Sequence, residues 1–231
     1  MCARLFLPVS AEDLAEFLEI DVGELPEIEP RYNIAPTQDT LVVRAARTGR
    51  RQASMLRWGL VPRFAKDPKI AQRLINARSE TAARRGVFRE SLRARRCAVP
   101  AAGFYEWKKM GRVRQPFAIR PRTGLIAFAG LWDSWQGDGR RFETFTILTT
   151  SPNEAIAAIH DRMPVILDRE QLAGWLDPVH DIDDVSPLLR PYPADRLVIE
   201  PVSTRVNRAD FDDPSCLQPV AIPLPEQRTL F

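Results

Sequence analysis

The sequence predicts an α+β fold in which antiparallel sheets form the centre and helices pack outside. Seven short segments are rich in β-branched or aromatic residues and are bounded by Pro, Gly or charged turns. These segments do not alternate with helices as the strands of a parallel sheet do. With 231 residues, 45% of them apolar, the chain is long enough to bury a full core as one domain or as two small ones.

Each element has its own local signal. Ser10 and Asp13 form a helix start signal, and the apolar residues that follow share one helical face, so a helix is expected over 11–19. The sequence Ser-Pro-Asn-Glu at 151–154 reads as a capping box with Pro152 in the first helical position, which predicts a helix running to about His160. Further helices are expected at 76–85 and 170–176, and an extended tail at 221–231. The expected strands are 40–45, 54–58, 97–100, 104–108, 116–120, 125–129 and 142–149.

The formal net charge of +3 conceals an uneven distribution. Residues 31–141 carry 25 cations and seven acids, a net of +18, whereas residues 1–30 have a net charge of −7 and residues 142–231 one of −8. A basic middle between acidic ends suits a protein with one face toward a polyanion. Arg supplies 29 of the 33 cations, and a high-GC genome would give the same Arg excess.

Several classes of protein are excluded by what the sequence lacks. No apolar stretch approaches the roughly 20 residues that span a bilayer, and no signal peptide is visible, so we expect a soluble, cytoplasmic protein without membrane contact. The cysteines Cys2, Cys97 and Cys216 lie far apart, and the chain has only two histidines. We therefore expect neither a disulfide framework nor a metal site, and no cofactor.

Cys2 is the most informative single residue. Loss of Met1 would leave a cysteine with both a free α-amine and a thiol, two groups that are partly nucleophilic near neutral pH. This pair suits acyl transfer, with the thiol attacking and the amine acting as base. It equally suits condensation with an aldehyde, in which the thiol closes a five-membered thiazolidine ring on an imine. An incidental small residue in an opening strand is the third interpretation.

Two further residues have contexts that suit proton transfer. In the segment 103–108, Gly-Phe-Tyr-Glu-Trp-Lys, a strand would place Glu106 among aromatic side chains, which raises a carboxyl pKa toward neutrality. An exposed position or an ion pair with Lys108 is the alternative. His160 falls at the end of its expected helix, where the dipole favours a protonated ring, and simple capping is the competing role.

Nine motifs in order carry a resemblance that no one of them carries alone. They are MCAR at 1–4, RYNIAPTQ at 31–38, RWGLVP at 57–62, NARSET at 76–81, CAVPAAGFYEWK at 97–108, AGLWD at 129–133, TILTT at 146–150, HDRMPVIL at 160–167 and PVSTRVN at 201–207. Together they resemble the SOS-response-associated peptidase family of abasic-site processing proteins. The resemblance implies a single domain over 1–220 with an open, barrel-like core, whose basic cleft holds single-stranded DNA.

Site roles follow from the same resemblance. It implies that mature Cys2 forms a thiazolidine crosslink with the ring-opened sugar of an abasic site, with lyase-like and peptidase activity as further possibilities. Asn76 would orient Cys2 or the sugar, Glu106 would move protons, and His160 would act on the sugar hydroxyl or phosphate side. DNA contacts are expected from Arg4, Asn33, Pro36, Phe64, Arg78, Phe88 and Thr149. The expected protein is a monomer that associates with the nucleoid when bound to DNA.

The chain departs from the family pattern at two positions. Ala3 stands where the family has Gly, and Phe64 stands near a position where the family has Trp. A methyl group at residue 3 restricts the backbone beside Cys2, whereas Phe64 still offers an aromatic face to a base. Two other functions stay open: an N-terminal-nucleophile amidohydrolase or glutamine amidotransferase without a DNA role, and a noncatalytic reader of modified bases.

Overall fold

The computed structural model describes residues 2–46, 49–111 and 113–221, and it confirms the α+β class with mainly antiparallel sheets. The expected tail at 221–231 lies outside the described residues except for Ala221. No helix within the described ranges is both long and apolar enough to cross a membrane.

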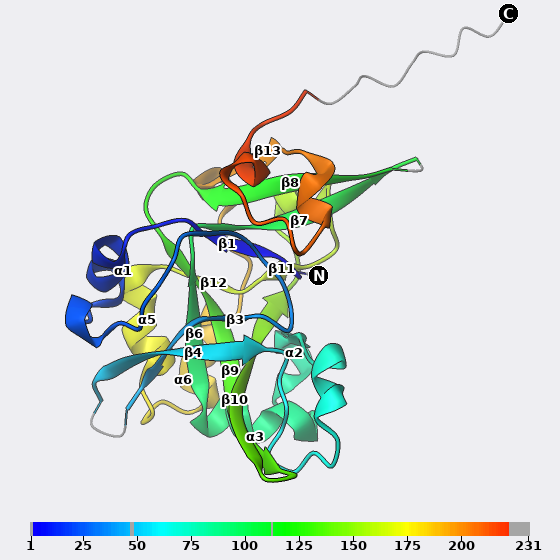
Figure 1. Ribbon diagram of the computed structural model, residues 1–231. Helices are drawn as coiled ribbons and strands as arrows, with labels where there is room; N and C mark the ends of the chain where they lie inside the picture. The colour runs from blue at the N-terminus through cyan, green and yellow to red at the C-terminus, as the bar shows by residue number, and fades with distance from the viewer. Residues whose placement is uncertain (1, 47–48, 112, 222–231) are drawn as a thin grey trace, which may run out of the picture.

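Five strands form a barrel at the centre of the molecule (Figure 1). They are β3 (Asp39–Ala45), β4 (Arg51–Trp58), β6 (Arg96–Ala101), β9 (Ile126–Gly137) and β10 (Arg140–Thr150). Pairing runs from β10 through β4, β3, β6 and β9 and returns to β10, so the barrel closes. The β10–β4 pair is parallel, as is the pair of β10 with the short strand β5 (Asn76–Arg78); the other pairs are antiparallel.

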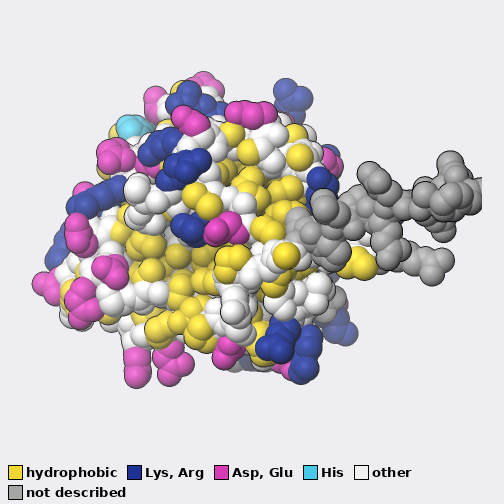
Figure 2. All heavy atoms as spheres, turned by 90° about the horizontal axis from the view of Figure 1, so that it is seen from above, with side chains coloured by type: hydrophobic (Ala, Val, Ile, Leu, Met, Phe, Trp, Pro, Cys, Tyr) yellow, Lys and Arg dark blue, Asp and Glu magenta, His cyan; other side chains and the backbone are white. Residues whose placement is uncertain are grey.

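A second, five-stranded sheet lies against the barrel. Its order is β13 (Leu197–Pro201), β8 (Val113–Pro121), β7 (Gly103–Met110), β1 (Leu5–Leu7) and β2 (Arg31–Ile34). Phe104 of β7 meets Phe128 of β9 edge to face at 5.7 Å, so one apolar core joins the sheet to the barrel. From above this sheet, hydrophobic side chains gather in the middle of the surface and charged ones around it (Figure 2).

Helices cover the outside. In Figure 1, α1 (Ala11–Leu18) and α5 (Arg169–Leu176) lie on one side of the barrel, while α2 (Ser79–Ala82) and α3 (Gly86–Ala94) lie on the opposite side. The Ser10 signal is confirmed, because its side chain accepts a hydrogen bond from the Asp13 amide. The remaining elements include α4 (Glu154–Ala157), α6 (Ile182–Val185), β11 (Met163–Pro164) and β12 (Ile166–Leu167), with short 3₁₀ turns at Pro68–Arg73, Thr204–Asn207 and Pro214–Leu217.

Two local expectations, the helix at 76–85 and the helix that runs to about His160, are wrong. Residues 76–78 of the expected helix 76–85 form β5, since β10 supplies a strand partner, and only 79–82 are helical there. Asn153, not Ser151, caps α4 by accepting from the Ile156 amide at 2.9 Å, and the helix ends at Ala157, before His160. The motif at 31–38 begins as β2, because β1 pairs with its first residues.

The turn after β4 explains the Gly in the RWGLVP motif. Gly59 adopts φ +127°, and a Cβ there would lie 2.9 Å from the carbonyl oxygen of Ala71. Its amide donates to the Phe145 carbonyl at 2.8 Å. The chain therefore leaves the barrel at a position that only glycine fits without strain.

Candidate functional site

Four residues that are far apart in sequence define the candidate site: Cys2, Asn76, Glu106 and His160. Cys2 precedes β1, Asn76 opens β5, Glu106 lies within β7, and His160 lies between α4 and β11. Cys2 and Glu106 are almost fully buried, Asn76 is partly buried, and the His160 side chain is 25% exposed. The site therefore sits just beneath the surface.

Strand pairing places the chain end beside Glu106. Leu5 of β1 lies opposite Phe104 of β7, and the Tyr105 amide donates to the Arg4 carbonyl at 3.0 Å. Because the strands are antiparallel, the chain before Leu5 continues along β7 toward Glu106.

Strand β10 brings the other two residues together. Its residue Thr149 is paired with Arg78 of β5 on one side and with Pro164 of β11 on the other. Asn76 and the turn that carries His160 therefore flank the same end of β10.

Asn76 is joined to Cys2 directly. Its amide Nδ2 donates to the Cys2 carbonyl at 2.7 Å, which fixes the backbone of Cys2. Among the described residues, the other amide atom, Oδ1, has no hydrogen-bond partner although it is buried. A buried polar atom in this state costs free energy, and such atoms are found where a ligand group completes the site.

The electrostatics of the site favour protonated groups. Burial raises the pKa of Glu106, and the nearby charge of His160 lowers this pKa by a smaller amount. Burial also raises the pKa of the Cys2 thiol, and the Glu106 carboxylate raises it further. A neutral thiol thus lies beside a carboxyl group that holds its proton to higher pH than usual, an arrangement suited to proton transfer.

The His160 ring is oriented by the chain that follows it. Its Nδ1 accepts from the Arg162 amide at 3.0 Å and lies 3.1 Å from an Asp161 carboxylate oxygen. The turn therefore holds the ring. His160 does not cap a long helix, which was the competing interpretation of its position in the sequence.

Arg4 and Asn33 have internal partners in place of the expected DNA contacts. Arg4 Nη1 donates to Asn33 Oδ1 at 2.7 Å and to the Val206 carbonyl at 2.6 Å. Asn33 is fully buried, so it cannot line a cleft, and its Nδ2 donates to the carbonyls of Val206, Arg208 and Phe211. Arg4 thus links the segment before β1 to Asn33 and to residues 206 and 207.

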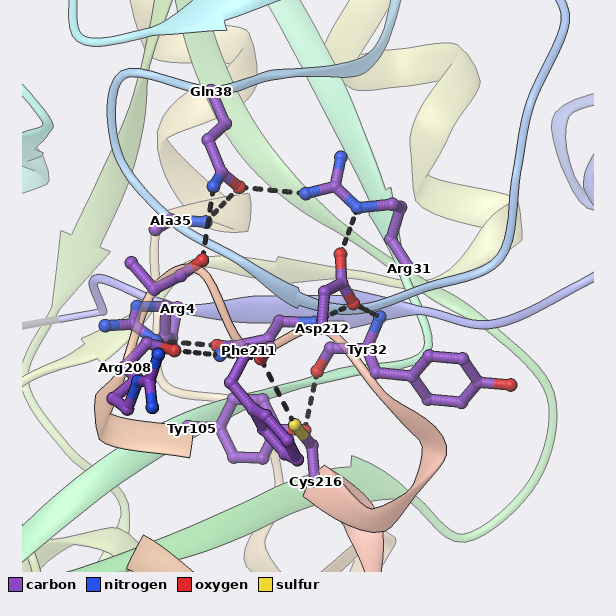
Figure 3. A network of polar contacts seen from close by, with 12 residues as sticks. Arg4, Arg31, Tyr32, Ala35, Gln38, Tyr105, Arg208, Phe211, Asp212 and Cys216 are labelled. Carbon is purple, nitrogen blue, oxygen red and sulfur yellow. Dashed lines mark hydrogen bonds and ion pairs between the residues drawn. The ribbon is translucent and has the colours of Figure 1, made fainter. Parts of the chain in front are cut away.

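These contacts belong to a network that holds residues 203–216, here called the C-terminal strap, against β2 (Figure 3). The Asp212 carboxylate accepts from the amides of Tyr32 at 2.6 Å and Asn33 at 3.0 Å and pairs with Arg31. Tyr105 of β7 donates its hydroxyl to the Tyr32 carbonyl at 2.8 Å.

The other expected DNA contacts divide by exposure. Phe88 and Thr149 are 1% and 0% exposed, so neither reaches the surface, because α3 turns Phe88 into the core and β10 turns Thr149 inward. Phe64 is 62% exposed and Arg78 is exposed. Pro36 lines an open cavity of about 500 Å³ beside the chain end, together with Ala3, Arg4, Ala35, Trp107, Arg114, Asn207 and Ala209.

Sequence reasoning passed over several residues that the fold places at the site. Trp107 donates its indole N–H to Asn207 of the strap at 2.7 Å, and Arg162 pairs with Glu80. Each lies inside a motif that the sequence had singled out, and that motif was the only available signal. Within the described ranges, no group of three His, Cys, Asp or Glu residues is placed to hold a metal ion.

Comparison with known proteins gives a consistent result. The family model described as SOS response associated peptidase (SRAP) matches residues 1–209. The abasic site processing protein YoqW of Bacillus subtilis is 42% identical over 224 residues, covering 94% of this chain and 99% of the relative. YobE of the same organism, also called an abasic site processing protein, is 42% identical over 217 residues, covering 91% and 98%.

A solved structure agrees on the fold. A protein from Bacteroides thetaiotaomicron superimposes with a TM-score of 0.82 at 24% identity, covering 95% of this chain and all of the other. With the family model spanning most of its length, this chain belongs to the SRAP family.

Proposed function

We propose that this protein processes abasic sites in single-stranded DNA by forming a covalent crosslink between Cys2 and the sugar. One observation carries the proposal: Cys2, Asn76, Glu106 and His160 come from four separate segments and meet at the start of the chain. Asn76 bonds the Cys2 backbone, and Glu106 interacts electrostatically with both Cys2 and His160. The names of the relatives, abasic site processing proteins, support the choice of substrate.

The proposed reaction uses both nucleophiles of a mature N-terminal cysteine. After Met1 is removed, the Cys2 α-amine adds to the aldehyde carbon of the ring-opened deoxyribose, and loss of one water leaves an imine. The imine nitrogen keeps its proton, and the thiol adds to the imine carbon and gives its own proton to the Glu106 carboxylate. The product is a thiazolidine, and one water is released overall.

The surrounding residues supply proton transfer and orientation. Glu106, with its raised pKa, gives a proton to the departing hydroxyl and takes one from the thiol. Asn76 holds the Cys2 backbone so that amine and thiol reach the same carbon. His160 acts at the sugar hydroxyl, where proton transfer opens the ring.

DNA binding is proposed for two exposed groups, one aromatic and one cationic. Phe64 offers a face for base stacking, and Arg78 offers a cation to a phosphate. The +18 charge of residues 31–141 would make the affinity depend on salt. A single strand is the expected substrate, because extruding the sugar costs least where pairing is absent.

Two finer activities extend the proposal. His160-assisted strand cleavage from the imine would be a lyase activity. Self-removal of Met1 would be the narrowest form of the peptidase activity in the family name. Mass spectrometry of the N-terminus from a strain without methionine aminopeptidase tests the second: Cys2 at the start supports self-processing, and retained Met1 contradicts it.

The central test is a crosslinking assay. Mature protein is incubated with a single strand that contains one abasic site, and denaturing electrophoresis detects the adduct. We expect an adduct with the wild type and none with Cys2→Ala. Cys2→Ser, which keeps the amine, should form only an adduct that requires borohydride reduction.

Two controls make the assay specific. Cys216→Ala removes a different buried thiol and should leave adduct formation unchanged. A tetrahydrofuran site has no aldehyde and should give no adduct. Equal adduct from the wild type and Cys2→Ala, or none from either, would contradict the proposal.

A further inference from the structure

Arg162 is almost buried, and its side chain is held from two directions. Its side chain is 13% exposed. Nη1 donates to Glu80 Oε1 at 2.7 Å and Nη2 to Oε2 at 2.8 Å, a bidentate pair that fixes the guanidinium plane. Nη2 also donates to the Thr149 carbonyl at 2.7 Å. The guanidinium therefore ties the turn at 160–162 to both α2 and β10.

The backbone of Arg162 in turn orients the His160 ring. Its amide donates to Nδ1 at 3.0 Å, and its carbonyl oxygen lies 3.2 Å from the same nitrogen. A shift of the Arg162 backbone would therefore rotate or release the ring. The ring lies close enough to Glu106 for its charge to lower the pKa of that carboxyl group, so the change would be felt within the site.

Glu80 belongs to the same segment as Asn76. Asn76 opens β5, and Glu80 follows four residues later in α2. The Glu80–Arg162 pair therefore fastens the His160 turn to the segment that bonds Cys2. This pair therefore keeps the His160 turn at a fixed distance from the segment that carries Asn76.

The two side chains of the pair differ in exposure. Glu80 is 49% exposed, so water limits what the pair contributes to stability, whereas Arg162 is 13% exposed and the bidentate geometry fixes its guanidinium. Hydrogen bonding from Arg162 lowers the pKa of Glu80, so its carboxylate is ionised and accepts from Arg162 at neutral pH. The pair therefore fixes the orientation of the Arg162 guanidinium at neutral pH.

We propose that Glu80 is a positioning residue that acts through Arg162 to orient the His160 ring. The consequence for catalysis rests on the proposed function, whereas the consequence for the ring does not. Two experiments separate these, one without DNA and one with it.

The first experiment observes the ring by NMR. The chain has only two histidines, His160 and His180, so ¹H–¹⁵N spectra resolve both rings. Glu80→Ala should shift the His160 ring signals and leave those of His180 in place. Glu200→Ala, which removes a partly exposed carboxylate from the Arg120–Glu200 pair, should shift neither. Unchanged His160 signals in Glu80→Ala would overturn the inference.

The second experiment measures the rate of adduct formation on abasic single-stranded DNA. Displacing an oriented catalytic group costs about tenfold or more, so Glu80→Ala should slow the reaction by about tenfold. Glu80→Gln keeps one acceptor oxygen and should recover part of that loss. Glu200→Ala should match the wild type.

The double variant separates positioning from a general structural effect. In a His160→Ala background, Glu80→Ala should cause no further loss, because the group it orients is gone. The inference would be overturned if Glu80→Ala slowed the His160→Ala protein by the same factor as it slows the wild type. A wild-type rate of adduct formation in Glu80→Ala alone would also overturn it. Absence of any wild-type adduct would instead refute the proposed function, and the ring signals would still decide the role of Glu80.

Discussion

The C-terminal strap network and the candidate site both adjoin strand β1, but they differ in how fully their buried polar groups are hydrogen-bonded. In the network, Asn33 Nδ2 reaches three carbonyls and Asp212 accepts from two amides and Arg31. In the site, burial raises the pKa of Glu106 and of the Cys2 thiol, and the Asn76 Oδ1 atom has no partner among the described residues.

The difference distinguishes a region that maintains the fold from the region for which we propose chemistry. Satisfied buried groups rigidify their surroundings, while desolvated ionisable groups cost stability and gain reactivity. The strap holds β2 and Arg4 in place, and this in turn holds the chain end beside Glu106. Substitutions in the two regions should therefore have opposite effects on stability and on activity.

The largest effect is expected from Glu106→Gln. Loss of the proton-transfer group should slow adduct formation by about 10²- to 10³-fold. The melting temperature should rise, by about 2 °C, because the variant no longer buries an ionisable carboxyl group. Crosslinking kinetics and thermal denaturation at pH 7 measure the two quantities. A lower melting temperature would show that Glu106 stabilises the fold as the strap network does, which would contradict the contrast between the two regions.

The same residue predicts a pH dependence of stability. The folded-state pKa of Glu106 lies above its unfolded value, so the native protein binds this proton more tightly. Its contribution is therefore favourable at low pH and is lost as pH rises through the raised pKa. Between wild type and Glu106→Gln, the difference in unfolding free energy should grow in favour of the variant as pH rises above about 4.5. A difference independent of pH would contradict the assignment.

Asn33→Ala should show the opposite pattern. It removes the three hydrogen bonds that Asn33 Nδ2 donates to strap carbonyls and the one that Oδ1 accepts from Arg4, all at a fully buried position, which should cost about 3 kcal/mol of unfolding free energy. Chemical denaturation measures this loss. Asn207→Ala removes an amide from the rim of the strap and serves as the milder control. An Asn33 variant as stable as the wild type would show that the network does not anchor the strap.

Phe64 belongs to neither region and tests DNA binding alone. Phe64→Ala should weaken binding to single-stranded DNA by about 1–2 kcal/mol, the range for loss of one stacked base, without changing stability. Fluorescence anisotropy at fixed salt measures the affinity. Met55→Ala, which removes an exposed apolar side chain from β4, should bind like the wild type. Equal affinities for both variants would exclude Phe64 as a stacking platform.

Gln38→Ala should have the smallest effect. Gln38 lies at the edge of the strap network, where its Oε1 accepts from the Ala35 amide at 3.1 Å and from Arg31. Because water can replace these contacts, the loss should be about 0.5–1 kcal/mol by denaturation. A loss as large as that of Asn33→Ala would show that the stability lost at a network residue does not depend on how buried that residue is.

The strands were the most predictable part of the molecule. Six of the seven predicted segments lie inside observed strands, and the seventh, 125–129, extends one residue before β9. Alternation and turn residues signal such strands locally. The helix α3, the edge strands β2 and β13, and closure of the barrel were not predicted, because they depend on partners that are distant in sequence.

The site was predictable only in part. The contexts of Cys2 and Glu106 carried chemical signals of their own, and burial of Glu106 among aromatic groups agrees with the structure. Asn33, Thr149 and Phe88 were assigned to DNA because the family resemblance implied these contacts. Their actual burial follows from neighbours contributed by the strap, β5 and the core.

By itself, the sequence determined which residues have suitable chemistry: an aminothiol after loss of Met1, a carboxylate between aromatics, and a basic middle segment. Tertiary structure decided which of them meet, which are exposed and which have protonation equilibria shifted by burial. The physical reason is that residue type and local pattern are properties of short segments. Desolvation, hydrogen-bond satisfaction and charge interactions instead depend on groups that only the folded chain brings within a few ångströms of one another.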